Sequence, residues 1–156
     1  MVRYQGEKMS KSLGNLIWAR DLMRAYGADA VRAAVHNHPY HETWEYNASE
    51  MDAAARLVHQ LREALAVPGG SRPAIAAEPN IARFEAAMDD NLNTRQALQV
   101  LARFAAEITY IGANGYAVRG AQAALRKLAA ILGMTLGEAV EPRVAAGWGI
   151  QLARFV

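Results

Sequence analysis

Apolar residues recur at intervals of three or four through most of the chain, and no stretch alternates apolar and polar residues as a half-buried strand does. Such spacing gives each segment one apolar face, so the pattern predicts an all-α fold. Helices are expected over residues 17–26, 28–37, 49–66, 80–89, 94–111 and 119–132. In 94–111 one apolar face carries Leu98, Leu101, Phe104, Ala105 and Ile108. In 49–66 the expected buried stripe is Met51, Ala54, Val58, Leu61 and Leu65.

Several of these helices begin or end at residues that typically cap a helix. Ser49 and Asp52 have the spacing of a capping box, in which the two side chains satisfy backbone N–H groups at the helix start. Thr94 is suited to cap the helix that begins there. Gly27 is expected to end the first helix in the left-handed conformation.

One segment has the composition of a linker. Residues 67–79 contain three of the five Pro and the pair Gly69-Gly70, which favour turns and exposed connections. We therefore expect two packed helical subdomains, 1–66 and 79–156, joined by a linker at 67–78. Residues 150–156 could form the first turns of a helix that continues beyond the chain.

The composition excludes several classes of protein. The chain is 53% hydrophobic and 21% charged, which is typical of a domain with a packed core and not of a disordered segment. The net charge of +2 argues against a polybasic nucleic-acid binder. The absence of Cys rules out disulfides and Cys-ligated metals. No apolar run is long enough for a membrane span, so a cytoplasmic protein is expected.

Candidate chemistry lies in the N-terminal stretch 1–15, which is expected to be a loop. Of the 17 Lys and Arg residues only three are Lys, and two of these, Lys8 and Lys11, lie three residues apart between Gly6 and Gly14. Ammonium groups and hydroxyls on a loop bracketed by glycines suit a movable contact with a polyphosphate. The spacing is not that of a Walker A loop. A solvated N-terminal tail is the alternative.

The string Lys8-Met9-Ser10-Lys11-Ser12 resembles the KMSKS signature of class I aminoacyl-tRNA synthetases, and Leu13-Gly14-Asn15 is its usual continuation. Residues 20–32 also resemble the helices that follow this loop in several synthetases. The resemblance implies an ATP-binding site formed by Lys8, Met9, Ser10, Lys11 and Ser12. It further implies that Lys11 is the main catalytic residue and that Lys8 assists it, both through charge and not through proton transfer.

A second segment narrows the choice of family. Residues 84–98 closely resemble the helical segment that follows the catalytic half of cysteinyl-tRNA synthetases, which typically reads F-x-x-A-M-D-D-D-F-N-T-P-x-A-L. The chain departs from it at Asn91, Leu92 and Arg95. The related ligase that joins cysteine to a glucosamine–inositol precursor in mycothiol synthesis shares the pattern. It remains an alternative, as does a non-catalytic RNA-binding or scaffold paralogue.

The resemblance places much of the parent enzyme outside this sequence. A nucleotide-binding domain with a Cys-ligated zinc is expected to precede residue 1, and further helices of an anticodon-binding-like bundle are expected after residue 156. The parent would use Mg-bound ATP and cysteine and would bind tRNA(Cys), whereas the chain itself would hold no metal. We therefore expect a fragment of a cysteine–tRNA ligase that is not catalytically competent in isolation.

A pair of carboxylates and a group of three histidines are interpreted as structural and not as catalytic or metal-binding. The adjacent carboxylates Asp89 and Asp90 are expected to favour the positive end of the following helix and not to perform acid–base chemistry. His36, His38 and His41 fall in one six-residue window, but we expect them to be packing or surface residues and not metal ligands.

Overall fold

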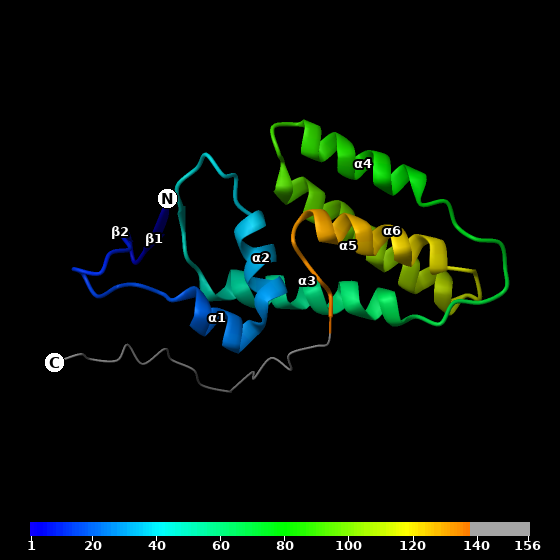
Figure 1. Ribbon diagram of the computed structural model, residues 1–156, viewed down its shortest axis with the longest axis horizontal. Coiled ribbons are helices and arrows are strands. Elements are labelled where there is room, and N and C mark those ends of the chain that lie inside the picture. The colour runs from blue at the N-terminus through cyan, green and yellow to red at the C-terminus, as the bar shows by residue number, and fades with distance from the viewer. Residues whose placement is uncertain (138–156) are drawn as a thin grey trace.

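The computed structural model describes residues 1–137, and residues 138–156, including the predicted helix at 150–156, lie outside the described part. The described part contains six helices and three short strands (Figure 1). The helices are α1 (Ala19–Tyr26), α2 (Ala28–His36), α3 (Ala48–Ala66), α4 (Glu78–Asp89), α5 (Thr94–Ala113) and α6 (Arg119–Ile131). The strands are β1 (Val2–Tyr4), β2 (Glu7–Lys8) and β3 (Trp44–Glu45). The all-α prediction is confirmed in that the fold is mainly helical.

The prediction that residues 1–15 form a loop was wrong for residues 2–8, which form a β-hairpin. β1 pairs antiparallel with β2 and parallel with β3, so that the sheet order is β2-β1-β3. Strands of two or three residues are too short to show an alternating pattern, which is why the periodicity missed them. The sheet fixes the N-terminal segment to the connection between α2 and α3.

Two predicted helix caps were displaced by neighbouring asparagines. The side chain of Asn47, and not that of Ser49, caps α3, because its Oδ1 accepts the Ser49 amide at 2.9 Å. The side chain of Asn93 likewise caps α5 by accepting the Gln96 amide at 3.2 Å. Thr94 was therefore wrongly expected to be the cap, and its hydroxyl instead donates to the carbonyl of His36. The cap thus lies two residues earlier than expected in α3 and one residue earlier in α5.

Other expectations about helix ends and faces need smaller corrections. Gly27 has a positive φ of 85°, but its ψ of 154° is extended and not left-handed helical. In α3 the buried stripe ends at Ala64, which is fully buried, while Leu65 is only partly buried. The predicted stripe of α5 is buried throughout.

One hydrophobic core runs through the helices. α3 packs against α2, α5 and α6, and α2 also contacts α5. Leu61 of α3, Phe104 of α5 and Leu125 of α6 are each 0% exposed within it. Gln122 of α6 reinforces this packing, because its Nε2 donates to the carbonyls at the end of α3, including that of Ala64 at 3.0 Å. Two of the orphan carbonyls of the helix end, those of Ala64 and Leu65, thereby gain a donor.

The connection between α3 and α4 lies against the turn between α5 and α6. The amide of Gly70 donates to the carbonyl of Tyr116 at 2.8 Å, and the amide of Arg72 donates to that of Gly115 at 3.0 Å. A Cβ at Gly70 would lie 2.1 Å from the Gly115 oxygen, so only glycine permits this approach. Figure 1 shows this connection at the opposite end of the molecule from the strands. A division into subdomains at 67–78 stays a prediction.

Candidate functional site

A β-hairpin carries Lys8, the first of the ATP-binding residues expected at 8–12, and the loop at 8–15 begins there. Lys8 ends β2 and pairs with Arg3 of β1. The hairpin turns through Gln5 and Gly6, whose φ angles are 54° and 79°, as a two-residue type I′ turn requires. The Gly6 amide donates to Oε1 of Glu45 at 2.8 Å, which ties the turn to β3. Lys8 therefore extends from a short sheet and not from a free tail.

Asn15 closes the loop on itself. Its Oδ1 accepts the Ser10 amide at 2.8 Å, and its Nδ2 donates to the Lys8 carbonyl at 3.3 Å. Inside the ring so formed, the Gly14 amide donates to the Lys11 carbonyl at 3.2 Å. One side chain thus joins the two ends of the segment that bears both lysines. The sequence interpretation noted Asn15 only as part of the signature and assigned it no role.

The predicted ligands lie together on this closed loop. Lys8, Lys11 and Ser12 are exposed, whereas Met9 and Ser10 are partly buried. The hydroxyls of Ser10 and Ser12 lie 3.2 Å apart. Within residues 1–137, no carboxylate comes within ion-pair distance of Lys8 or Lys11. Two exposed ammonium groups without such partners can bind an anion without first breaking an ion pair.

Aromatic residues hold the sheet against the start of α3. The His38 ring stacks on Trp44 of β3 with centroids 4.0 Å apart, and its Nε2 lies 2.8 Å from Oε2 of Glu50 in α3. Tyr4 of β1 meets Tyr46 edge-on at 6.0 Å. Burial raises the pKa of Tyr46 above its ordinary value. The loop is therefore braced by a packed aromatic cluster behind the sheet.

Tyr26 continues this cluster at the end of α1. Burial raises its pKa, and the nearby Asp52 carboxylate of α3 raises it further, mainly by repelling the phenolate. The neutral phenol is therefore the form that the fold favours.

The three clustered histidines point to different partners. Nε2 of His36 lies 3.1 Å from the Leu132 carbonyl, His38 contacts Glu50, and His41 is an exposed residue beside Glu42. No group of three or more His, Asp or Glu side chains within residues 1–137 could hold a metal ion.

The carboxylates Asp89 and Asp90 both lie at the end of α4 and are exposed. Asp90 acts on the next helix only indirectly, because its Oδ2 accepts from Nδ2 of Asn93, the residue that caps α5.

Asp29 is a buried carboxylate that the sequence interpretation did not single out. It is 3% exposed and accepts the amides of Thr135 and Leu136, each at 3.0 Å. Nη2 of Arg62 and Nη1 of Arg32 lie 3.3 and 3.5 Å from its oxygens. Asp29 thus joins α2 and α3 to the segment after α6. Its position two residues after Gly27, in the first turn of α2, was the available signal, because acidic residues favour the first turn of a helix.

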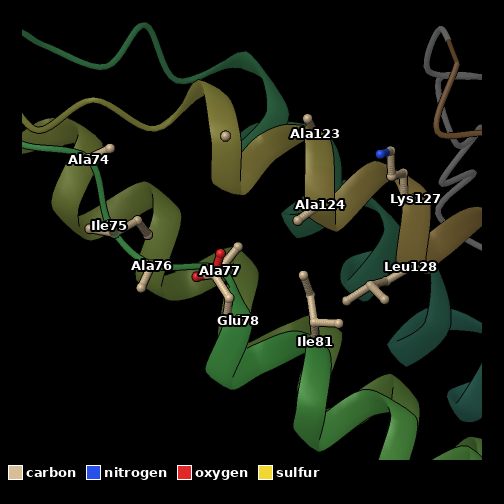
Figure 2. A pocket seen from close by; sticks show the side chains of 11 residues that line it. Ala74, Ile75, Ala76, Ala77, Glu78, Ile81, Ala123, Ala124, Lys127 and Leu128 are labelled. Atoms are coloured by element: carbon tan, nitrogen blue, oxygen red, sulfur yellow. The ribbon is translucent and has the colours of Figure 1, made fainter.

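A separate pocket of about 530 Å³ lies between the start of α4 and α6 (Figure 2). Its walls are mostly apolar, with Ile75, Ile81 and Leu128 among them, and Glu78 and Lys127 supply its charged side chains. None of its lining residues belongs to the loop at 8–15.

None of the helices within residues 1–137 combines the length and the hydropathy that crossing a bilayer requires.

Comparison with protein families divides the chain in two. Residues 1–56 match the catalytic domain of class I (C) tRNA synthetases. Residues 83–137 match the DALR domain. The first match contains the hairpin, the loop closed by Asn15 and the sheet that supports them. The second contains most of α4 together with α5 and α6.

Individual relatives agree with this division. The cysteine–tRNA ligases of Sodalis glossinidius and Haemophilus influenzae are each 38% identical to the chain over 140 residues. That of Escherichia coli K12 is 36% identical over 135 residues. In each case the match covers 86% of this chain but 29% of the relative, so the chain spans under a third of the length of these proteins. The chain is therefore a homologue of the cysteine–tRNA ligases, which are class I aminoacyl-tRNA synthetases, over the region that runs from the KMSKS loop into the helical DALR domain.

Proposed function

We propose that the chain supplies the phosphate-binding loop and part of the tRNA-contacting helices of an ATP-dependent cysteine–tRNA ligase. In the first step of that reaction, a carboxylate oxygen of cysteine attacks the α-phosphorus of Mg-bound ATP, and the bond to the leaving pyrophosphate breaks. In the second step, a ribose hydroxyl at the end of tRNA(Cys) attacks the cysteinyl carbonyl, and AMP leaves. The chain's loop acts in the first step.

The observation that carries this proposal is the pair of exposed lysines on a loop that one asparagine closes. As pyrophosphate departs, negative charge grows on its oxygens. Lys11 is assigned as the main group that stabilises this charge, and Lys8 assists. Ser10, Ser12 and the backbone of Met9 help to position the phosphates. Preorganised charge of this kind lowers the barrier because it needs little rearrangement as the reaction proceeds.

The helices after the loop are assigned to tRNA(Cys) and to the rest of the parent protein. Support comes from the match of residues 83–137 to the DALR domain and from the names of the relatives. A nucleotide-binding domain outside this sequence would provide the adenosine and cysteine sites. Because the reaction serves translation, we place the parent protein in the cytoplasm.

Zinc does not fit the residues of this chain. The zinc expected from the resemblance is bound by cysteines, and the chain has none. No step of the proposed chemistry in this chain is assigned to a metal that its residues would hold. The zinc is proposed to belong to the part of the parent outside this sequence.

The test is a chimera in which residues 1–137 replace the matching stretch of the E. coli cysteine–tRNA ligase. The assay is cysteine-dependent exchange between ATP and pyrophosphate, followed by aminoacylation of tRNA(Cys). We expect the chimera to perform both reactions, whereas the 156-residue chain alone should show no exchange above background. The matched control replaces the same stretch by residues 1–137 with Lys8→Ala and Lys11→Ala, which removes both charges.

The possible results separate the alternatives. An inactive chimera that folds and binds ATP would contradict the proposal and would favour a non-catalytic scaffold or RNA-binding module. If a chimera exchanged pyrophosphate but charged the glucosamine–inositol acceptor of mycothiol synthesis in preference to tRNA, the related ligase would be the correct assignment.

A further inference from the structure

Arg3 lies directly opposite Lys8 in the N-terminal hairpin. The antiparallel register pairs Arg3 of β1 with Lys8 of β2, and both residues are exposed. Side chains of directly opposite residues point to the same face of a sheet, with Cβ atoms about 4.5–5.5 Å apart. Two cations are therefore held side by side on the face of the sheet that is opposite Tyr4. Like charges in this arrangement repel each other and destabilise the pair.

No described carboxylate forms an ion pair with either cation, although Glu45 is the neighbour of Arg3 across the sheet. Glu45 of β3 lies opposite Arg3 on its other side, but its Oε1 accepts the amide of Gly6. Within residues 1–137, no ion pair shorter than 4.0 Å joins Arg3 or Lys8 to a carboxylate. The two arginines of α1 differ, because Arg20 and Arg24 lie 3.6 and 3.8 Å from Asp21.

We propose that Arg3 is a third phosphate-binding cation, which acts together with Lys8 and Lys11 on the polyphosphate of the nucleotide or on the pyrophosphate product. This inference rests on the proposed function of the loop. A guanidinium can bind two phosphate oxygens at once, whereas each ammonium acts as a compact charge. A bound polyphosphate between Arg3 and Lys8 would turn their repulsion into two attractive contacts.

A polyphosphate fits this site better than an RNA backbone. The three cations belong to one hairpin and the five-residue signature that it opens, with Lys11 only three residues beyond Lys8. Cations grouped on so short a stretch of chain match a ligand that concentrates several negative charges on neighbouring oxygens. An RNA strand spreads one charge over each nucleotide and would favour cations spaced along a longer surface.

The test uses the 156-residue chain and inorganic pyrophosphate with Mg²⁺ as the probe, with affinity measured by calorimetry. Arg3→Gln should weaken pyrophosphate binding about 5-fold to 30-fold. This range corresponds to the loss of a charged contact worth about 1–2 kcal/mol, because a factor of ten in affinity corresponds to about 1.4 kcal/mol. Arg3→Lys should retain most of the affinity. Arg24→Gln is the matched control and should leave the affinity unchanged, because Arg24 is on α1 beside Asp21.

A second measurement separates ligand binding from a structural role. Because Arg3 and Lys8 repel each other without a ligand, Arg3→Gln should leave the melting temperature at low salt unchanged or raise it. A variant that loses both affinity and thermal stability would show that Arg3 supports the hairpin, and it would overturn the inference. So would an unchanged pyrophosphate affinity in Arg3→Gln.

The result for Lys11 distinguishes this inference from the proposed function. If Lys11→Ala weakens pyrophosphate binding and Arg3→Gln does not, the loop assignment stands and the role of Arg3 falls. If neither variant changes the affinity, or the wild-type chain binds no pyrophosphate, the role of Arg3 falls, and the loop assignment is decided separately by the pyrophosphate exchange of the chimera. A short RNA duplex serves as the last arm: Arg3→Gln should weaken its binding less than that of pyrophosphate, and the reverse would assign Arg3 to RNA.

Discussion

The hydroxyl of Thr94 donates a hydrogen bond to the carbonyl of His36 at 2.7 Å, across 58 positions of the chain. Thr94 is the first residue of α5 and His36 the last of α2. Beside this bond, Nε of Arg95 donates to the Asn37 carbonyl at 2.8 Å. The start of one helix thus satisfies the carbonyls at the end of another, and it joins the DALR part of the chain to the part that carries the loop.

Replacement of Thr94 should therefore destabilise the junction between α2 and α5. Thr94→Val preserves the size of the side chain but removes the donor, and we expect a loss of about 1 kcal/mol in the free energy of unfolding. Asn93→Ala, which removes the cap of α5, should cost about 1 kcal/mol by a different route. Urea unfolding of each variant measures both effects. A loss below about 0.3 kcal/mol for Thr94→Val would show that the interhelical bond contributes nothing.

The loop should depend on Asn15 for its closed form. Asn15→Ala removes the acceptor of the Ser10 amide and the donor to the Lys8 carbonyl, so the Ser10 amide should exchange with solvent about 5-fold to 10-fold faster, as expected for one lost hydrogen bond. Asn15→Asp retains the acceptor and should restore most of the protection. Asn114→Ala, at the end of α5, is the control. Equal exchange at Ser10 in wild type and Asn15→Ala would contradict the closed loop.

Asp29 should be the most sensitive polar position in the described part. Its removal leaves Arg62 and the amides of Thr135 and Leu136 without their shared acceptor. For Asp29→Ala we expect a loss of about 3–5 kcal/mol in the free energy of unfolding, as is typical when one member of a buried ionic network is deleted. Asp21→Ala, an exposed carboxylate on α1, should cost less than about 1 kcal/mol. Similar losses for the two variants would contradict the assigned network.

The pKa of Tyr26 should respond to Asp52. The folded chain holds this pKa above the ordinary value of about 10. The fold favours the neutral phenol, so its contribution to stability is fully present below pH about 10 and is lost as the pH rises through the folded pKa. Asp52→Asn should lower the pKa of Tyr26 but leave it raised, because burial is the larger cause. Ultraviolet titration of the phenolate, with Tyr26→Phe to identify its signal, measures this shift. An unchanged pKa in Asp52→Asn would exclude the contact.

The helical core was accessible from sequence because its signal repeats within each helix. The stripe of Leu98, Leu101, Phe104, Ala105 and Ile108 follows the helical period, and all five residues are buried. Burial of one face is a local property of a helix, so the sequence of that helix suffices to predict it.

The contacts that organise the site were not accessible in this way. Asp29 and Leu136 are 107 positions apart, and Thr94 and His36 are 58 apart. The hydrophobic periodicity within one helix carries no information about contacts between residues so far apart in the sequence. Thr94 also shows why caps are hard to assign, because two adjacent residues were both capable caps and the tertiary bond to His36 engaged one of them. The loop residues were found through the signature, whereas the role of Asn15 required the geometry.

The central claim is that Lys11 meets the phosphates as charge builds in the transition state. The most direct test is the rate of cysteinyl-adenylate formation in a single turnover, measured in the chimera with and without Lys11→Ala, together with the affinity for cysteine. We predict a rate lower by about 10²–10³-fold, as for other single preorganised charge contacts, with little change in cysteine affinity. Lys8→Ala should have a smaller effect of the same kind. A rate within about twofold of the unmodified chimera would correspond to less than about 0.5 kcal/mol of transition-state stabilisation, and it would contradict the role assigned to Lys11.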